Sequence, residues 1–472
     1  MTVAAPMLLS LASCGRSPTW VLEPPSTEEP PPVSCVDGSS CEQVPCPAGF
    51  ERAGDACVDI DECASSTASC AADTRCENTP GSFECVCYPA LEGVVRVEDS
   101  ACPAPRLGSG ARHTCLVDED GALWCWGANE AGQLGDGTFV DRGALTKVGA
   151  DADWLSVTAG DKHTCALRTD GSAWCWGSTE YPTDFVQEDA VPSEVPSSLP
   201  WVALSAGGQH TCGIRTDGSL WCWGINSCGQ LGTGDGGHSP PPIEPMPGST
   251  FIATSVNAGH TYAIRSDGTL WWWGAFWGKG GCGAQAPSQA GDATSWTAVS
   301  AGEGVIGRFG FPSESGACGL HRSGELWCWT AGGAELDFNE VGPTQTWRGV
   351  TAGSRHVCAI DHAGSLSCWG DNTHAQLGHG DHSPQETPAV VGGPETWAVA
   401  AAASSHTCAM TQDDRLWCWG SNADGAIGIG SVAKTPQTVP IRVGTDAWDD
   451  VAMQESICGR RTNGSLWCWG LN

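Results

Sequence analysis

Eight copies of one short pattern, spaced about 50 residues apart, constrain this chain more than any other feature of its sequence. Each copy has two marked positions ten residues apart, and in seven copies both positions are cysteine. A clear copy is GDKHTCALRTDGSAWCWG, which begins at Gly160 and contains Cys165 and Cys175. A fixed repeat of this length is typical of arrays in which each unit buries its apolar face against the next unit.

The constant spacing of ten predicts a β-hairpin with facing cysteines. If residues 169–171 (TDG) form a three-residue loop with the glycine left-handed, Arg168 faces Ser172 and Cys165 faces Cys175. The cysteines then form a non-hydrogen-bonded pair with Cα atoms about 4.5 Å apart, which a disulfide tolerates. The seven predicted hairpin disulfides are Cys115–Cys125, Cys165–Cys175, Cys212–Cys222, Cys318–Cys328, Cys358–Cys368, Cys408–Cys418 and Cys458–Cys468.

The fourth copy tests this geometry, because it lacks both cysteines at once. Tyr262 and Trp272 occupy the two positions, so an aromatic pair replaces the covalent pair. The alternative of a metal site is disfavoured, since ligands ten apart in separate repeats form no CxxC cluster. Two cysteines are left over in the array, Cys228 and Cys282, and they fall in matching loops of adjacent repeats, where we expect them to bridge.

Tryptophans occupy the other face of each hairpin. Trp174 and Trp176 are two residues apart and therefore share one side of a strand, which neighbouring repeats must cover. A further strand precedes hairpins two to eight, and a glycine-rich turn such as residues 132–135 (GQLG) follows some of them. With a linking strand, each unit becomes a four-stranded blade, and a closed ring of blades protects the strand edges. The preceding strands begin at Trp154, Trp201, Phe251, Trp296, Trp347, Trp397 and Trp448.

The repeat GxxHTCAxRxDGxLWCWGxNxxGQLGxG resembles the regulator of chromosome condensation repeat family over residues 104–472. The resemblance implies an all-β fold, a β-propeller of four-stranded blades. The family typically has seven blades, whereas eight hairpins favour eight, so seven to eight are expected, and no closing strand follows the last hairpin. The fifth repeat departs most, through an insertion at 303–315, and its Arg308, Phe309 and Phe311 are the candidate recognition loop.

A cysteine-rich segment, DIDECASSTASCAADTRCENTPGSFECVC, begins at Asp59 and continues to Cys102. It resembles the calcium-binding subclass of EGF-like domains over residues 59–102. Calcium prefers hard oxygen ligands, and the resemblance implies that the side chains of Asp59, Glu62 and Asn78 and the carbonyls of Ile60, Thr79 and Ser82 supply them. It also implies the bridges Cys63–Cys76, Cys70–Cys85 and Cys87–Cys102. The alternative is a calcium-free EGF fold whose acids are solvated.

Residues 35–58 look like the back half of another EGF-like unit, because CPAGF starts at Cys46 and runs on to Cys57. On this resemblance Cys46 pairs with Cys57, which leaves Cys35 for Cys41. Small units with so little apolar core need such staples to fold.

The chain starts with an apolar run, residues 1–14, that ends in Cys14. It resembles the lipobox of bacterial lipoproteins, although no Lys or Arg precedes the apolar run, and it implies a signal peptide with lipid attached to Cys14. The run is too short to span a bilayer, which takes about 20 residues, so an acyl group is the expected membrane anchor. The alternative is a nonlipidated signal with a chance cysteine. Residues 15–34 are rich in Pro and acid and predict an extended linker.

Charge and cysteine content restrict the compartment and the partners. The 22 basic and 54 acidic residues give a net charge of −32, which argues against nucleic acid as a partner. The 27 cysteines indicate an oxidising, extracytoplasmic compartment, with the bacterial outer membrane or cell surface the expected location.

No signature of a catalytic motif is present, and we expect a nonenzymatic, cell-surface protein-binding or adhesion scaffold that binds Ca²⁺. The alternatives are a proteinaceous inhibitor of an extracytoplasmic enzyme and a polysaccharide hydrolase or lyase. Guanine-nucleotide exchange, the founding activity of the repeat family, would require another compartment. Recurring histidines before the hairpin cysteines are interpreted as bonding to local backbone rather than to metal, and the cluster His374, His379 and His382 is interpreted as a solvated loop.

Overall fold

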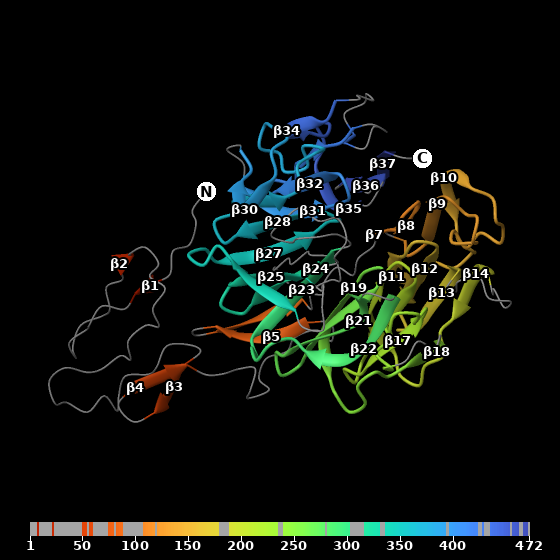
Figure 1. Cartoon of the computed structure of the whole chain (residues 1–472), viewed down its shortest axis with the longest axis horizontal. Coiled ribbons are helices and arrows are strands. Elements are labelled where there is room, and N and C mark those ends of the chain that lie inside the picture. The colour runs from red at the N-terminus through yellow and green to blue at the C-terminus, as the bar shows by residue number, and fades with distance from the viewer. Residues whose placement is uncertain are drawn as a thin grey trace. The chain divides into compact units, whose positions relative to one another are not determined.

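A computed structural model shows a β-propeller preceded by short two-stranded ribbons (Figure 1). The chain divides into two compact units, of which the first is Met1–Cys87 with Arg96–Cys102 and the second is Tyr88–Val95 with Pro103–Asn472. In the second unit the structure describes residues 107–118, 120–178, 188–234, 239–278, 281–302, 316–330, 336–392, 396–422, 427–428, 435–453, 456–461 and 466–470; in the first it describes six strands.

The six strands of the first unit pair two by two, each pair antiparallel. The pairs are β1 (Met7–Leu8) with β2 (Val21–Leu22), β3 (Phe50–Ala53) with β4 (Ala56–Asp59), and β5 (Thr74–Thr79) with β6 (Ser82–Cys87).

In its described residues, the second unit contains seven four-stranded blades and one three-stranded sheet, here called sheet eight. Figure 1 shows them following one another in chain order, from orange to blue. Blades one to four consist of β7 (Leu107–Ser109), β8 (His113–Val117), β9 (Leu123–Gly127), β10 (Arg142–Lys147); β11 (Trp154–Ala159), β12 (His163–Arg168), β13 (Ala173–Ser178), β14 (Glu188–Glu194); β15 (Trp201–Ala206), β16 (His210–Arg215), β17 (Leu220–Gly224), β18 (Ser239–Ile243); β19 (Phe251–Val256), β20 (His260–Arg265), β21 (Leu270–Gly278) and β22 (Gly281–Gln289). Blades five to seven and sheet eight consist of β23 (Trp296–Gly302), β24 (Gly316–His321), β25 (Leu326–Thr330), β26 (Asp337–Val341); β27 (Trp347–Ala352), β28 (His356–Asp361), β29 (Leu366–Gly370), β30 (Gln385–Val390); β31 (Trp397–Ala402), β32 (His406–Thr411), β33 (Leu416–Gly420), β34 (Gln437–Arg442); β35 (Trp448–Met453), β36 (Ser456–Arg461) and β37 (Leu466–Gly470).

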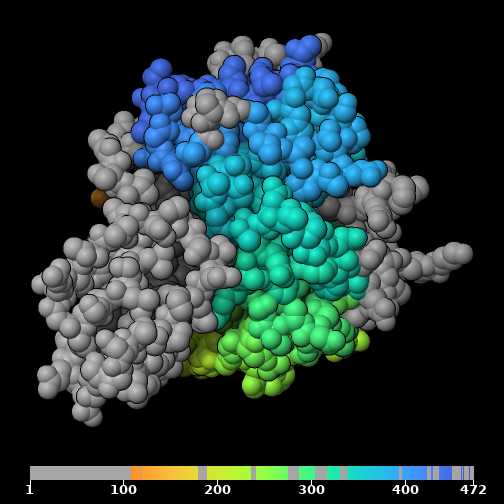
Figure 2. Space-filling view, turned by 90° about the vertical axis from the view of Figure 1, so that its left-hand side faces the viewer, coloured from red at the N-terminus to blue at the C-terminus, as the bar shows by residue number. Residues whose placement is uncertain are grey.

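The innermost strands close the ring. Successive first strands contact one another from β7 through β11, β15, β19, β23, β27 and β31 to β35, and β35 in turn contacts β7. Sheet eight therefore lies between blade seven and blade one and completes the circle with three strands. Figure 2 shows part of this succession, in which the sheets coloured green to blue lie side by side in chain order.

The predicted hairpin register is confirmed. Cys165 faces Cys175, and the backbone N–H of Arg168 donates to the carbonyl of Ser172 at 3.0 Å. Gly171 has a φ of +79°, the left-handed conformation that the three-residue loop requires. In the fourth blade Tyr262 faces Trp272, as expected for the aromatic substitute.

Six hairpin disulfides are present among the described side chains, each with a Cα–Cα distance of 4.1 Å. They are Cys115–Cys125, Cys165–Cys175, Cys212–Cys222, Cys318–Cys328, Cys358–Cys368 and Cys408–Cys418. Cys458 and Cys468 face each other in the strand register, but their side chains lie outside the described residues. Cys228 is disulfide-bonded, and the side chain of its predicted partner Cys282 is likewise outside them.

Tryptophans fill the contacts between blades. Trp176 is 1% exposed and packs with Leu134, Val157 and Trp154 in one cluster shared by blades one and two. The same arrangement recurs around the ring, where Trp273, Trp329 and Trp419 are equally inaccessible. The prediction that neighbouring repeats cover the tryptophan face is thus confirmed.

Candidate binding surface

One end of the propeller is built from the hairpin turns. In blade two the turn is fixed by hydrogen bonds in series: Ser172 donates to Asp170 at 2.7 Å, and the indole Nε1 of Trp174 donates to the hydroxyl of Ser172 at 3.0 Å. The carbonyl of Gly171 accepts the backbone N–H of Trp201 in the next blade at 2.7 Å. The turn of blade two therefore positions Trp174 in its own blade and holds the start of the following inner strand.

Arginines stack on these tryptophans in three consecutive blades. The guanidinium carbon of Arg168 lies 4.3 Å from the ring centre of Trp174, and that of Arg215 lies 3.9 Å from Trp221. Arg265 lies 5.7 Å from Trp271 in blade four. Such cation–π contacts contribute about 0.5–1 kcal/mol each at partly exposed sites. The six residues form a continuous series that we call the Arg–Trp arc: Arg168, Trp174, Arg215, Trp221, Arg265 and Trp271.

The arc does not extend around the whole ring. The arginine position is Asp118 in blade one, His321 in blade five, Asp361 in blade six and Thr411 in blade seven. Sheet eight repeats the pair, with Arg461 4.0 Å from the ring centre of Trp467. A surface that varies from blade to blade on a repeating scaffold is where recognition is expected, because packing alone would repeat in every blade.

Buried histidines connect blades near the starts of the second strands. His163 Nε2 lies 2.9 Å from the hydroxyl of Thr211 in the next blade, and His210 bonds Thr261 in the same way at 2.9 Å. The expectation that these histidines bond to local backbone is therefore wrong, since their described partners are threonine side chains about 50 residues away. Burial lowers the pKa of His163 to about 4 and that of His210 to about 3, so these side chains are neutral at physiological pH.

The histidine cluster of blade six forms no metal site among the described residues. His379 Nε2 lies 2.9 Å from the carbonyl of Ala389, and His374 Nδ1 lies 3.1 Å from the hydroxyl of Thr373. No group of three His, Cys, Asp or Glu side chains in the described part of the chain is arranged to hold a metal ion.

The predicted calcium ligands are described only as backbone. In the β5–β6 hairpin Thr79 pairs with Ser82 and Asn78 pairs with Phe83, so three expected ligand residues lie together at one end of the hairpin. Asp59 is the last residue of β4, whereas Ile60 and Glu62 lie outside the described residues. The assignment of Asn78, Thr79 and Ser82 as calcium ligands stays a prediction.

Other predicted sites also lie outside the described part of the chain. These are the lipidation site Cys14 and the recognition loop with Arg308, Phe309 and Phe311. The side chains of the N-terminal cysteines are not described either: Cys35, Cys41, Cys46, Cys57, Cys63, Cys70, Cys76, Cys85, Cys87 and Cys102. Within the described residues no helix is both long and apolar enough to cross a bilayer.

Sequence reasoning missed the Arg–Trp arc, although a signal was present. Arg168, Arg215 and Arg265 each stand six residues before a tryptophan, directly ahead of the turn. Residues that close a hairpin on the same face lie close together, so this spacing could have predicted the stack.

Family models match both parts of the chain. The description "Regulator of chromosome condensation (RCC1) repeat" belongs to two models, and "Calcium-binding EGF domain" matches residues 59–102. The protein thus contains RCC1 repeats arranged as a β-propeller, preceded by a calcium-binding EGF domain. The repeat matches cover residues 106–133, 154–181, 201–230 and 400–426 for one model and 120–167, 217–264 and 363–410 for the other.

Solved structures show the same fold at low sequence identity. Yeast RCC1 (Prp20) bound to Kap60 has a TM-score of 0.51 and 18% identity, covering 77% of this chain and 79% of that one. A second structure, Prp20p from Saccharomyces cerevisiae, described with its binding properties to Gsp1p and histones, has a TM-score of 0.51 and 19% identity over 80% of this chain and 85% of that one. This likeness establishes the fold.

Curated relatives match short segments. Human "Signal peptide, CUB and EGF-like domain-containing protein 2" is 41% identical over 71 residues, which is 15% of this chain and 7% of that protein. Mouse "Protein disulfide isomerase Creld2" is 42% identical over 52 residues, 11% of this chain and 15% of that protein. The chain thus spans a small part of the length of either relative. An RCC1-repeat propeller joined to a calcium-binding EGF domain fits a protein-binding scaffold.

Proposed function

We propose that this protein is a nonenzymatic scaffold that binds a protein partner through the Arg–Trp arc, outside the cytoplasm. A lipid on Cys14 would hold it to a membrane, the segment 15–34 would act as a linker, and the EGF-like module would carry Ca²⁺. The propeller would then present its turn-bearing end to a surface or secreted protein.

The Arg–Trp arc carries the proposal. It places three arginines and three partly buried tryptophans on neighbouring blades, and these residue types dominate the energetics of protein interfaces. Hydrogen bonds to Ser172, Ser219 and Thr269 fix the indoles before any partner arrives. A rigid aromatic surface loses little conformational entropy on binding.

The same geometry favours a protein over a polysaccharide. An indole that binds a sugar needs an open ring face, whereas Arg168 and Arg215 each occupy a face of a tryptophan in the arc. Where a guanidinium edge reaches the surface, it adds hydrogen-bond donors suited to carboxylates and carbonyls of a protein. Arg168 and Arg265 also form ion pairs within the propeller, with Asp151 and Asp267.

The hairpin disulfides support export. Six of them lie in the blades, and cysteines in a reducing cytosol would not stay paired in such numbers. Lipid attachment is tested separately by Cys14→Ser, which should move the protein from the membrane fraction to the soluble fraction. Retention in the membrane fraction would reject the anchor.

Calcium binding follows from the EGF-like domain and is tested on the full chain by calorimetry. Glu62→Gln or Asn78→Ala should weaken calcium binding, because each removes a proposed oxygen ligand. Glu84→Gln is the matched control, since Glu84 lies on the same hairpin opposite Glu77 and outside the ligand set. Equal calcium affinity in all variants would refute the proposed site.

The binding proposal is tested with a variant that the chain itself suggests. Blade six has Ser367 where the arc has tryptophan, so the triple variant Trp174→Ser, Trp221→Ser and Trp271→Ser imitates a natural blade. Photo-crosslinking to intact cell envelopes should capture one partner with the native protein and lose it with the triple variant. Trp417→Ser, in blade seven outside the arc, should retain it.

Three further outcomes separate the alternatives. Capture that survives in the triple variant but disappears on deletion of 303–315 would move recognition to the predicted loop. Binding to a glycan array without any protein crosslink would favour the polysaccharide alternative. A captured hydrolase whose activity falls on binding would identify an inhibitor rather than an adhesion protein.

A further inference from the structure

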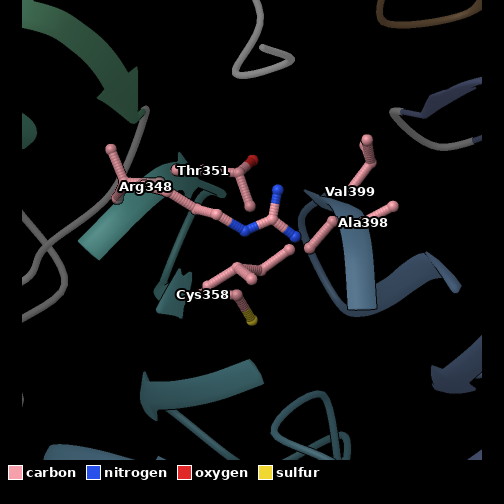
Figure 3. A pocket seen from close by; sticks show the side chains of 9 residues that line it. Arg348, Thr351, Cys358, Ala398 and Val399 are labelled. Atoms are coloured by element: carbon pink, nitrogen blue, oxygen red, sulfur yellow. The ribbon is translucent and has the colours of Figure 1, made fainter. Parts of the chain in front are cut away.

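A small cleft lies between blades six and seven. It has a volume of about 20 Å³ and is lined by residues of β27, β28 and β31, among them Arg348, Gly349, Cys358 and Val399. Figure 3 shows the Arg348 side chain extending across it toward Ala398 and Val399. A space of this size holds a group as large as a water molecule, so one oxygen-bearing group fits it.

Glycine lines the cleft at position 349. The corresponding position holds Ser156, Ala203, Ala298 and Val399 in other blades. A Cβ atom built on Gly349 would meet no heavy atom within 4 Å. Blade six therefore omits a side chain at a place where the structure has room for one.

Arg348 is equally unusual among the inner strands. Its position holds Leu155, Val202, Ile252 and Ala398 in other blades, and β27 contributes the one basic residue of the eight inner strands. Burial lowers the pKa of Arg348, and the nearby Asp361 opposes that shift. An arginine nevertheless keeps its charge at neutral pH.

Within the described residues, the hydrogen bonds of Arg348 leave donors free for a ligand. Its Nε donates to the carbonyl of Asp361 at 3.2 Å, and its Nη2 donates to the carbonyl of Trp397 in blade seven. These bonds hold the guanidinium across the cleft and use two of its five N–H groups. Three remain, including both on Nη1.

No carboxylate in the described part of the chain forms an ion pair with Arg348. The Asp361 carboxylate instead accepts the backbone N–H of Ser365 at 2.7 Å. By contrast Arg168 lies 2.6 Å from Asp151, and Arg461 lies 2.8 Å from Asp446. Among the described residues, Arg348 is thus held by backbone carbonyls alone, in a chain with 54 acidic and 22 basic residues.

We propose that the cleft between blades six and seven binds a carboxylate group, with Arg348 as its cationic donor and Gly349 providing the space. A carboxylate matches the fork of N–H donors on a guanidinium, and one of its two oxygens fits the water-sized space of the cleft. The carboxylate can belong to a small acid or to an acidic side chain of a protein. This inference stands whether or not the Arg–Trp arc binds a partner.

The test uses the full-length protein with sodium acetate and, separately, a blocked Gly-Glu-Gly peptide as probes, each against sodium chloride at equal ionic strength. With arginine-labelled protein, the Nε–H resonance of Arg348 should shift saturably with either carboxylate. Saturation with acetate alone would assign the site to small acids, and saturation with the peptide alone would assign it to protein side chains.

Two variants test the charge of Arg348 and the space beside Gly349 separately. Gly349→Ala retains Arg348 but puts a methyl group into the cleft, and Arg348→Met removes the donor. Arg348→Met should weaken carboxylate binding by about tenfold or more, because a charge-assisted hydrogen bond contributes about 1.5–3 kcal/mol. Gly349→Ala should weaken it as well, because the methyl group takes up space that the ligand needs. Arg322→Met, at an exposed turn of blade five, is the matched control and should bind as the native protein does.

Two results would overturn the proposal. One is a shift of the Arg348 resonance that rises linearly and equals the shift caused by chloride. The other is undiminished carboxylate binding in folded Gly349→Ala. Arg348→Lys is used if Arg348→Met fails to fold, because lysine keeps the charge but lacks the forked N–H donors of a guanidinium. Native carboxylate affinity in Arg348→Lys would also contradict the proposed geometry.

Discussion

The imidazole Nε2 of His113 in blade one lies 2.8 Å from the hydroxyl oxygen of Thr164 in blade two. That hydroxyl also donates its proton to the carbonyl of Gln133 at 2.8 Å. Because a threonine hydroxyl has one proton, His113 must donate from Nε2, which fixes its neutral tautomer. The same carbonyl accepts the indole N–H of Trp176 at 2.8 Å. One turn of blade one thus holds two residues of blade two.

Thr164 and Thr211 each join one blade to the next through a histidine, and their substitution should lower the free energy of unfolding by different amounts. Thr164→Val leaves both His113 and the carbonyl of Gln133 without this partner. Among the described residues, Thr211→Val removes the bond to His163 and a long contact with the Sγ of Cys165 at 3.6 Å. A buried polar group that loses its partner costs about 1–3 kcal/mol. We expect about 2 kcal/mol for Thr164→Val and about 1 kcal/mol for Thr211→Val, measured by urea unfolding.

The control for both is Thr216→Val, at an exposed turn position of blade three. It should change the free energy of unfolding by less than about 0.5 kcal/mol. Equal losses of the free energy of unfolding in Thr164→Val and Thr211→Val would contradict this prediction. The two substitutions remove the same atoms and differ in the groups that lose a hydrogen-bond partner.

The hydrogen bonds between histidine and threonine of neighbouring blades show what the sequence could not predict. Hairpin register depends on residues within ten positions of each other, so Cys165–Cys175 and Tyr262–Trp272 could be predicted from spacing alone. The partner of His113 is 51 residues away, and its identity depends on how one blade packs on the next. A faint signal exists, because blade five has Gly316 in place of the histidine and blade six has Val357 in place of the threonine.

Removal of a hairpin disulfide should destabilise the propeller. Cys212 and Cys222 close a loop with a sequence separation of 10, and cross-linking a loop of this size contributes about 3 kcal/mol through the unfolded chain. The double variant Cys212→Ala, Cys222→Ala should lose about that much free energy of unfolding. Reduction of the native protein should lower Tm further, because six described bridges are cut together. A Tm indifferent to reductant would be incompatible with bridged hairpins.

The aromatic pair of blade four should not be replaceable by a disulfide. Tyr262 and Trp272 are 0% and 2% exposed, and Tyr262 lies 5.7 Å from the ring centre of Trp329 in the next blade. The variant Tyr262→Cys, Trp272→Cys should form the bridge, because the register equals that of the cysteine pairs. Its Tm should nevertheless fall, since each lost aromatic side chain costs about 3–5 kcal/mol, more than the bridge adds.

Mass spectrometry would establish whether the bridge forms, and calorimetry would give Tm. Tyr262→Phe is the matched control, because it keeps the ring and removes the hydroxyl. If the bridged double variant melts above the native protein, the loss of the two aromatic side chains costs less free energy than expected. The aromatic pair would then contribute little to blade packing.

The candidate surfaces follow the same division between local and nonlocal information. The Arg–Trp stacks join residues six apart, such as Arg168 and Trp174, and are readable in principle from the hairpin. The Arg348 cleft depends on the carbonyl of Trp397, 49 residues away, and on the empty space beside Gly349. Neither property belongs to a single repeat, so the sequence predicts the blades but not the clefts between them.

Acid should lower the stability of the propeller at pH values above those at which ordinary carboxylates are protonated. Burial lowers the pKa of His113 to about 3, with a further contribution from the nearby His163, and burial lowers the pKa of His356 to about 3 and that of His406 to about 4. In the unfolded chain these groups titrate near 6.5. Between those values the unfolded state binds more protons, so stability is fully present above pH 6.5 and falls as the pH drops below it.

The expected slope is about 1.4 kcal/mol per pH unit for each buried histidine between pH 6 and pH 4.5. Urea unfolding at pH 7.5, 6.0 and 5.0 should show that the free energy of unfolding falls steeply between pH 6.0 and pH 5.0. His163→Gln should reduce the number of protons taken up on unfolding by about one, while it keeps a donor for Thr211. The exposed His374 supplies the matched substitution, His374→Gln, for the effect of the mutation itself. A free energy of unfolding that stays level from pH 7.5 to pH 5.0 would mean that these histidines take up protons as readily in the folded ring as in the unfolded chain. The hydrogen bonds between blades through neutral histidines would then have to be abandoned.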